Sequence, residues 1–339
     1  MVRELRNIAL HDRNSFGVRA NARLLIEFDE PESLIELLGS HNDLHEGRMA
    51  VLGGGNNILF TDDFDGTLLH PTGERFEITG ETANEVRIHA DAGMDWDRFV
   101  ERCTELGLWG AENLSAIPGT VGAAPVQNIG AYGAEARNII ESVEVVDLQT
   151  LKRLTIAGAH CSFGYRDSIF KSVLRDKVVI TGVNFRLKRQ ASPNLSYGML
   201  SEMAAKHNAS TPQEIRAEVI AIRNGKLPDP KVLGNAGSFY KNPVVDASTA
   251  AALKVLYPNM PQYATTDNTK IKLSAGWLIE QAGWKGVRKG CVGVYEKQAL
   301  VLVNHGGATG REVIALSDEI RRSVSEKFGI EIMCEVNIW

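Results

Sequence analysis

Several features that would assign the chain to a common class are missing from its 339 residues. It has only four cysteines (Cys103, Cys161, Cys291 and Cys334), which lie far apart and form no CxxC pair. This spacing argues against a disulfide framework or a metal site and favours reduced, packed thiols. No apolar run reaches the roughly 18 residues that a membrane-spanning helix needs. The first residues contain no apolar signal core, so we expect a cytoplasmic protein that is not exported.

An excess of positive charge is also missing. The formal net charge is −5, and a content of 44% hydrophobic and 23% charged residues is ordinary for a globular protein. The length allows about two or three domains. A slightly acidic chain has no general attraction to nucleic acid or to a membrane surface, so we expect neither as a partner.

Neither of the common nucleotide-binding motifs is present. A glycine turn, Gly53-Gly-Gly-Asn-Asn57, lies between apolar stretches at 48–52 and 58–60. A Rossmann fingerprint needs a further glycine where the chain has Ile58, and a P-loop needs Gly-Lys-Ser/Thr. Strand, glycine turn and strand would suit a backbone loop that binds phosphate, but a bulged hairpin turn explains the pattern equally well.

The most distinctive stretch is a glycine- and alanine-rich loop from Ser115 to Gly133. It contains four glycines, four alanines, two prolines and no charged residue. It is too apolar for a solvated linker and too interrupted for a long helix. Successive N–H groups can form a concavity that holds an anion. We therefore predict a loop that runs along a large, partly phosphorylated ligand, with a tight packing corner as the alternative.

The hydrophobic pattern predicts mixed helices and strands after an irregular start. Helices are expected to begin at the capping residues Asp95, Thr211 and Thr309, and a short helix is expected over Ser274–Gln281. Ser196–Leu200 is expected only to interrupt the pattern. A strand at 86–92 places His89 on its polar face, which favours a solvated histidine. The last strand, 330–338, alternates almost strictly and places Glu335 on the face opposite the isoleucines. Glu335 is most simply a solvated carboxylate there, although Met333 and Trp339 make that face mixed. Further strands are expected at 48–52, 143–148, 151–156, 177–187, 292–295 and 299–303.

Two segments carry residues that catalysis commonly uses. Gly164-Tyr-Arg-Asp-Ser168 presents Arg166, either in a surface ion pair or as a planar guanidinium for a carboxylate or phosphate. Gly234-Asn-Ala-Gly-Ser-Phe239 contains Ser238. This is not a nucleophile elbow, because Tyr240 stands where that motif needs glycine. Ser238 is therefore either a hydrogen-bond or proton donor, or an ordinary turn serine.

In this order, the motifs resemble those of the UDP-N-acetylenolpyruvylglucosamine (also written enolpyruvoylglucosamine) reductase family, the UDP-N-acetylmuramate dehydrogenases of peptidoglycan precursor synthesis. The resemblance runs nearly end to end, from the two glycine loops to Glu335. The insertion at Ser196–Gly198 resembles the form of the family that carries a tyrosine loop over the substrate. The chain departs from the family in having Asn56 where serine is frequent, and an amide can still donate to phosphate.

The resemblance implies an α+β fold. An FAD-binding fold of the vanillyl-alcohol-oxidase/PCMH type, with subdomains 1–70 (to which 329–339 return) and 71–225, would precede a C-terminal α+β substrate-binding domain, 226–328. FAD would be bound non-covalently, with its pyrophosphate on the two glycine loops. The resemblance assigns cofactor contacts to Gly53, Gly54, Gly55, Asn56, Asn57, Ser115, Ile117, Pro118, Gly119, Gly122, Gln127, Asn128, Gly130, Tyr132, Gly133 and Arg223.

The same resemblance implies the chemistry. NADPH would reduce FAD, and the flavin would pass hydride to C3 of the enolpyruvyl double bond. Arg166 and Glu335 would stabilise the charge that spreads into the substrate carboxylate, and Ser238 would protonate C2. A monomer and a ping-pong scheme are further expectations. Sugar-nucleotide contacts are assigned to Tyr197, Lys226, Asn242 and Gln298.

Two other functions compete with this prediction. A non-catalytic nucleotide-sugar binding protein would not need Arg166, Ser238 and Glu335 together. A flavin oxidase that uses oxygen often tethers the flavin through His or Cys near the glycine loops, and neither residue type occurs within 53–57 or 115–133. The reductase is therefore the favoured prediction.

Overall fold

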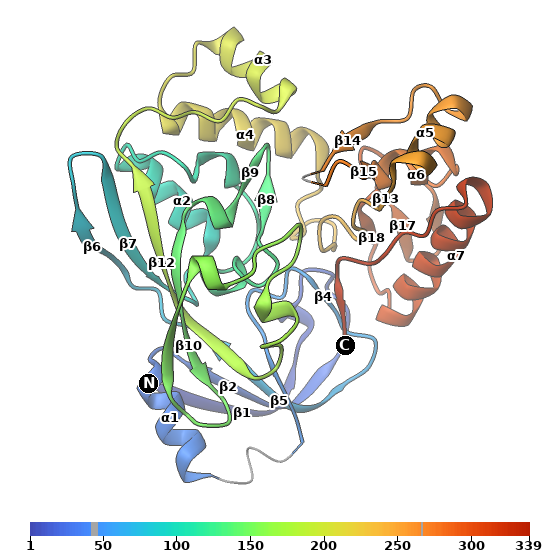
Figure 1. The fold of residues 1–339 in the computed structure, drawn as a ribbon. Coiled ribbons are helices and arrows are strands. Elements are labelled where there is room, and N and C mark those ends of the chain that lie inside the picture. Colours follow the sequence, from blue (N-terminus) through green and yellow to red (C-terminus); the bar gives the residue numbers. More distant parts are fainter. Residues whose placement is uncertain (42–46, 266) are drawn as a thin grey trace. The chain divides into compact units, whose positions relative to one another are not determined.

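The computed structural model describes residues 1–41, 47–265 and 267–339 (Figure 1). The chain divides into two compact units. The first contains Met1–Ile8, Ala22–Gly55 and Phe64–Gly225, and the second contains Ala9–Asn21, Asn56–Asp63 and Lys226–Trp339. The subdomain boundaries expected from the sequence stay a prediction. No helix within the described residues is long and apolar enough to span a membrane.

The first unit begins with a sheet and a covering helix. The helix, α1 (Pro31–Ser40), packs its buried leucines against apolar residues of this sheet. The prediction of an irregular start is therefore wrong. It failed because β1 is mostly exposed and lacks apolar alternation. β5 runs parallel to both β2 and β3. The strand order is β1 (Val2–Ala9), β2 (Asn21–Phe28), β5 (Phe64–Pro71), β3 (Arg48–Val51).

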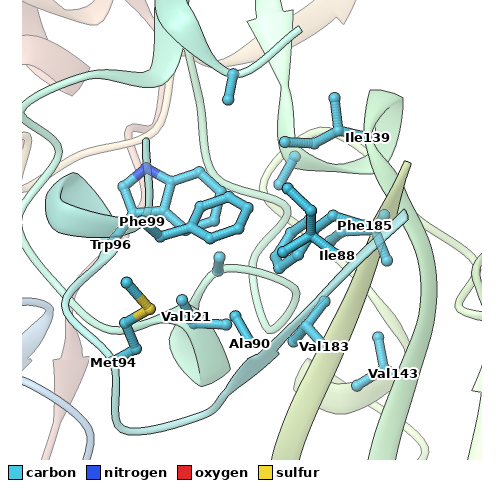
Figure 2. Packing of buried hydrophobic residues seen from close by; sticks show 14 of the residues in the cluster. Ile88, Ala90, Met94, Trp96, Phe99, Val121, Ile139, Val143, Val183 and Phe185 are labelled. Carbon is cyan, nitrogen blue, oxygen red and sulfur yellow. The ribbon is translucent and has the colours of Figure 1, made fainter. Parts of the chain in front are cut away.

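A second sheet of this unit supports the glycine-rich loop. Its neighbouring strands are all antiparallel. Helix α2 (Trp96–Glu105) packs on it, with the ring centroids of Phe99 and Phe185 4.3 Å apart (Figure 2). Val121 and Ala124 of the loop belong to the same core, so the loop is anchored to a rigid layer. The strand order is β11 (Arg153–Ala157), β10 (Ile140–Asp147), β12 (Val178–Lys188), β7 (Glu85–Asp91), β6 (Phe76–Glu81).

Two helices end the first unit. The predicted cap of α4 (Pro212–Lys226) is confirmed, because the Glu214 amide donates to Thr211 Oγ1 at 3.2 Å. The preceding helix, α3 (Gly198–His207), begins within Ser196–Leu200, which was expected only to interrupt the pattern. That prediction is wrong, and the reason is tertiary: Leu200 is fully buried against the apolar face of α4. A short pair of strands, β8 (Gly130–Ala131) and β9 (Ala134–Glu135), lies at the end of the glycine-rich loop.

The second unit contains small antiparallel sheets and helices. The short helix predicted for Ser274–Gln281 and the predicted helix start at Thr309 are confirmed, with Ser274 and Thr309 as the N-caps. A Cβ on Gly310, at the start of α7, would lie 1.8 Å from the Phe60 carbonyl, so only glycine lets the helix begin there. The sheets are β13–β15–β14 (Val244–Asp246, Lys270–Leu273, Gln262–Ala264) and β16–β17–β18 (Arg288–Lys289, Val292–Val294, Leu302–Asn304). The helices are α5 (Ala247–Leu256), α6 (Ala275–Gln281) and α7 (Gly310–Phe328).

The C-terminal segment differs from the long strand predicted for 330–338. Of these residues, all described, Asn337–Ile338 form β19, which pairs in parallel with β4 (Ile58–Leu59). Cys334 instead bridges to Tyr240. Because the segment changes partner between these two contacts, it bends, and the alternation shifts. Glu335 is therefore buried, with 9% exposure, and its predicted solvated position is wrong.

His89 is also buried, contrary to the prediction. Its side chain is 7% exposed and occupies space that Gly182 leaves, where a Cβ would lie 2.6 Å from the imidazole Cε1. Its Nε2 lies 3.0 Å from Asp91 Oδ1, and its Nδ1 lies 3.5 Å from Glu144 Oε1. These carboxylates raise the pKa of His89 to about 9, and the imidazole lowers the pKa of Glu144 to about 2. Asp91 lies on the same strand as His89, β7, but Glu144 lies on β10, two strands away in the sheet, and the local pattern does not reveal that contact.

Candidate functional site

Two glycine loops of the first unit lie against each other. A Cβ on Gly53 would stand 3.0 Å from Thr120 Oγ1 and 3.6 Å from Ala123 Cβ. Gly55 has a φ of +67° and Gly119 a φ of +136°, conformations that other residues adopt rarely. A Cβ on Gly119 would point into open space. Gly53 therefore allows the two loops to approach closely, and Gly55 and Gly119 allow backbone conformations that other residues adopt rarely.

Several backbone N–H groups of the two loops donate to no acceptor among the residues that the structure describes. Within the part of the chain that the structure describes, these are Gly53 and Gly54 on the first loop and Ile117, Gly119 and Thr120 on the second. Clustered N–H groups without protein partners are typical of a site that holds phosphate. The loops therefore fit the pyrophosphate of a dinucleotide.

Charged side chains hold the second loop in shape at Ala116, which has a φ of +55°. Its N–H donates to Asp97 Oδ1 at 2.5 Å, and its carbonyl accepts from Arg223 Nε at 3.1 Å. Asp97 also accepts from Arg216 Nη2 at 2.9 Å. A strained backbone of this kind persists only where its surroundings impose it. The contacts thus link α2 and α4 to the candidate phosphate loop.

Several predicted cofactor residues also support this loop internally. Ser115 is fully buried, and its hydroxyl donates to the Glu112 carbonyl at 2.6 Å. A Cβ on Gly122 would lie 2.6 Å from Ala92 Cβ. A Cβ on Gly133 would lie 2.2 Å from Ser196 Oγ. These residues shape the loop whether or not they touch a ligand, so their cofactor contacts stay a prediction.

An aromatic pair lies at the end of the same loop. The rings of Tyr132 and Tyr197 meet edge to face, with centroids 5.0 Å apart. Asn113 Nδ2 donates to the carbonyls of Tyr132 and Asn194, each at 2.7 Å, and so ties the loop to the segment before Tyr197. Tyr132 also interacts with Arg223, whose pKa burial lowers. Even so, an arginine stays charged near neutral pH.

Arg166 lies at the tip of a tight turn. The turn is closed because the Gly164 amide donates to the Asp167 carbonyl at 2.9 Å. Arg166 has a φ of +55°, and its Nη2 donates to the Gly130 carbonyl at 2.8 Å. A Cβ on Gly130 would lie 3.2 Å from Arg166 Nη1. The structure thus brings Arg166 to the glycine-rich loop, a contact that the two separate motifs did not reveal.

Three distant segments meet in the second unit around Glu335. The Glu335 amide donates to the Phe239 carbonyl at 2.8 Å, and Asn57 Nδ2 donates to the Glu335 carbonyl at 3.4 Å. Ser238, the residue before Phe239, is half-buried, and none of the described residues hydrogen-bonds its hydroxyl. Gly237 precedes it with a φ of +67°. A hydroxyl and a buried carboxylate are therefore carried by neighbouring backbone segments.

Two predicted substrate residues converge on the start of α6. Asn242 Oδ1 accepts from the Ala275 amide at 2.9 Å. Gln298 Oε1 accepts from the Leu300 amide at 3.3 Å and would lie 3.2 Å from a Cβ on Gly276. Because the oxygens accept from the backbone, the amide nitrogens are the atoms with which these residues can donate to a ligand.

The remaining predicted contacts are distributed over both units. Lys226 is the half-buried last residue of α4. Gln127 lies beside Lys171, with Oε1 3.5 Å from Nζ. Asn56 is half-buried and Pro118 is exposed. Arg166 belongs to the first unit, and Ser238 and Glu335 belong to the second. Joint action of these three residues is therefore a proposal, taken up below.

Comparisons with known proteins identify the family. The C-terminal domain model of UDP-N-acetylenolpyruvoylglucosamine reductase matches residues 229–339, and an FAD binding domain model matches residues 23–151. The UDP-N-acetylenolpyruvoylglucosamine reductase of Bacteroides fragilis (strain YCH46) is 44% identical over 333 residues, which cover 97% of this chain and 98% of the relative. The chain belongs to the UDP-N-acetylenolpyruvoylglucosamine reductase family.

Other members support this assignment and the fold. The reductase of Pseudomonas aeruginosa is 43% identical, with 98% of this chain and 97% of that protein covered. The crystal structure of the reductase from Thermus caldophilus has a TM-score of 0.68 at 24% identity and covers 100% of this chain and 99% of its own. The predicted α+β class is confirmed, with an FAD-binding domain and the C-terminal domain of this oxidoreductase family.

Proposed function

We propose that the chain is an NADPH-dependent flavoenzyme that reduces the enolpyruvyl group of UDP-N-acetylenolpyruvylglucosamine. The product would be UDP-N-acetylmuramate, a precursor of peptidoglycan. The observation that carries the proposal is the 44% identity, over nearly the whole chain, to a reductase of that name. FAD, when bound, supplies hydride from NADPH to C3 of the enolpyruvyl double bond. The open N–H groups of the two glycine loops would hold its pyrophosphate.

Arg166 is assigned the role of stabilising the negative charge that develops on the substrate as the double bond is reduced. Negative charge forms at C2 and spreads into the substrate carboxylate. A fixed cation stabilises this charge more strongly in the transition state than in the bound substrate, where the charge has not yet formed. The guanidinium is planar and permanently charged, which suits a carboxylate. Its hydrogen bond to the Gly130 carbonyl, 2.8 Å, supports a fixed orientation.

Ser238 is assigned the role of proton donor to C2. A serine hydroxyl is a weak acid, so it can act only on a strongly basic carbanion within hydrogen-bond reach. Its hydroxyl is hydrogen-bonded to none of the described residues, which supports its availability to a ligand. Glu335 would share in holding the enolic carboxylate, and its 9% exposure and backbone tie to Phe239 support a fixed position.

A diphosphate-bearing substrate needs cations and donors that a chain of net charge −5 must concentrate locally. Lys226 and the amides of Asn242 and Gln298 are assigned to the sugar nucleotide, with Tyr197 as an aromatic contact. Arg223, beside Tyr132, would face the flavin or the substrate. The sequence contains no dedicated dinucleotide fingerprint, which supports a ping-pong scheme in which NADPH and sugar nucleotide use one site. A monomer in the cytoplasm stays the expectation.

Steady-state turnover tests the proposal. Purified protein with FAD is expected to oxidise NADPH only when UDP-N-acetylenolpyruvylglucosamine is present, to give parallel double-reciprocal plots, and to form a product of the mass of UDP-N-acetylmuramate. NADH is compared at equal concentration. Oxidation of NADPH by oxygen at the same rate without the sugar nucleotide would favour an oxidase instead. Binding of the sugar nucleotide without turnover would favour a binding protein.

A further inference from the structure

Alternate residues of the segment 126–130 contact the turn that carries Arg166. Since every second residue takes part, one edge of this segment faces the turn. Three hydrogen bonds join them: Ser168 Oγ to the Val126 carbonyl (2.6 Å), Asn128 Nδ2 to the Gly164 carbonyl (2.9 Å) and Arg166 Nη2 to the Gly130 carbonyl (2.8 Å).

Both ends of the turn are therefore tied to the loop. Ser168 is 2% exposed, and its Oγ also accepts from the Phe170 amide at 3.2 Å. Asn128 is fully buried, and its Oδ1 accepts from the Arg137 amide at 3.0 Å. Between these tethers Arg166 keeps a positive φ, which a residue other than glycine retains only when its surroundings impose it. The place of the guanidinium thus depends on two polar side chains that lie away from solvent.

We propose that Ser168 and Asn128 are positioning residues that hold the Arg166 guanidinium in place for the reduction of the enolpyruvyl group. The inference rests on the proposed function, because it takes Arg166 as the group that meets the developing charge. A displacement of about 1 Å in such a group costs on the order of 10²-fold in rate. Loss of the Ser168 tether therefore slows the step that uses Arg166 and leaves the reduction of flavin by NADPH unchanged, and loss of the Asn128 tether slows the Arg166 step more than the reduction of flavin.

The chain offers a matched control at Ser172. Its hydroxyl also donates to a backbone carbonyl, that of Ser168 at 3.0 Å, but Ser172 is exposed and does not bond to the glycine-rich loop. Ser168→Ala removes one tether and Ser168→Thr keeps the hydroxyl. Asn128→Gly removes the other tether and tolerates the φ of +46° at that position. Ser172→Ala removes a hydroxyl without touching either tether.

The two half-reactions are measured separately by stopped-flow in the full-length, FAD-loaded proteins. Ser168→Ala is expected to slow reoxidation by UDP-N-acetylenolpyruvylglucosamine by about 10- to 100-fold, with reduction by NADPH within about twofold of the parent. In Asn128→Gly, which also alters a predicted cofactor contact, reoxidation is expected to slow by about tenfold more than reduction. Ser168→Thr and Ser172→Ala keep both rates. Equal slowing of both half-reactions, or undiminished reoxidation, would overturn the proposal. If Ser168→Ala does not retain FAD, the ratio of the two slowings in Asn128→Gly decides: equal slowing overturns the proposal.

An Arg166→Ala background tests whether the tethers act through the guanidinium. There, a second change at Ser168 or Asn128 is expected to cost nothing further, because residues that act as a unit are not additive. Amide hydrogen exchange over 164–168, faster in the tether variants than in Ser172→Ala, provides a readout independent of activity. If the second change slows the Arg166→Ala protein further, while the parent protein turns over normally, the positioning role of Ser168 and Asn128 is refuted and the proposed function is not. A parent protein that the sugar nucleotide does not reoxidise would refute the proposed function as well.

Discussion

The backbone amide of Glu335 donates to the carbonyl of Phe239 at 2.8 Å. This bond joins the last segment of the chain to the residue that follows Ser238, and Asn57 bonds to the same glutamate from a third segment. The half-buried Ser238 and the buried Glu335 thus lie on two segments that one backbone hydrogen bond joins. This arrangement suits a serine that delivers a proton beside a carboxylate that orients the substrate.

Replacement of Ser238 by alanine tests the proton donor. Ser238→Ala is expected to keep the reduction of flavin by NADPH and to slow enolpyruvyl reduction by about 10²- to 10⁴-fold, the usual contribution of a general acid. Rapid-mixing absorbance measures each half-reaction. Ser248→Ala, at an exposed position of α5, serves as the control. Turnover of Ser238→Ala within about tenfold of the parent would assign the proton to another group.

Gly119→Ala tests the phosphate loop. Because Gly119 has a φ of +136°, alanine forces the backbone to change and turns nearby N–H groups away from their present direction. A strain of about 1–3 kcal/mol predicts FAD affinity weakened by roughly 5- to 150-fold in a fluorescence titration. Gly107 has a φ of +71° and also faces open space, but it ends α2 away from the loop. Equal FAD affinity in Gly119→Ala and Gly107→Ala would contradict the assignment.

Tyr197→Ala tests the aromatic pair. Loss of the ring that meets Tyr132 is expected to raise the KM for the sugar nucleotide by about tenfold or more, the usual effect of removing an aromatic contact. The rate of flavin reduction by NADPH should stay unchanged. Met199→Ala, two residues further on and 40% exposed, is the matched control. An unchanged KM in Tyr197→Ala would remove the tyrosine from the substrate site.

The buried His89 predicts a pH dependence of stability. Its pKa is about 9 in the folded chain and 6.5 in the unfolded chain, so the folded state binds the proton more tightly. The stabilisation is therefore complete below pH 6.5 and is lost as the pH rises through 9, amounting to about 3 kcal/mol at most. The carboxylates of Asp91 and Glu144 outweigh the opposing Arg75, whose Nη2 lies 3.2 Å from the imidazole.

Urea unfolding between pH 6 and pH 10 checks this dependence. The free energy of unfolding of the parent should fall across that range, and the curve of His89→Asn should lie lower at pH 6 and be flatter. His160→Asn, at an exposed position, should retain the parental slope. Parallel curves for the parent and His89→Asn would exclude the imidazole as the cause.

Local signals were enough to predict some parts of the fold. The caps at Asp95 and Thr309 lie within a few residues of the helices that they begin, so the sequence carries the whole signal. The state of His89 depends instead on Gly182 of the adjacent strand and on the carboxylate of Glu144, two strands away in the sheet. The buried position of Glu335 depends on a change of pairing partner, which a regular alternation conceals.

Some features of the candidate site could likewise be predicted from the sequence, and others could not. The order of the motifs was enough to predict the family, because each motif is a short, continuous stretch of sequence. The contact between Arg166 and Gly130 was not predictable, since it depends on how two separate loops fold together. The two roles of Asn128, a predicted cofactor residue whose buried amide bonds to Gly164, likewise emerge only from the packed structure.

Anaerobic spectroscopy of the purified protein tests the central claim most directly. The protein as isolated, or after addition of FAD, should be yellow, should bleach on addition of NADPH, and should regain its colour only when UDP-N-acetylenolpyruvylglucosamine is added. A colourless protein that takes up no FAD would contradict the assignment of the glycine loops. A flavoprotein that NADPH bleaches but the sugar nucleotide does not reoxidise would contradict the reductase activity itself.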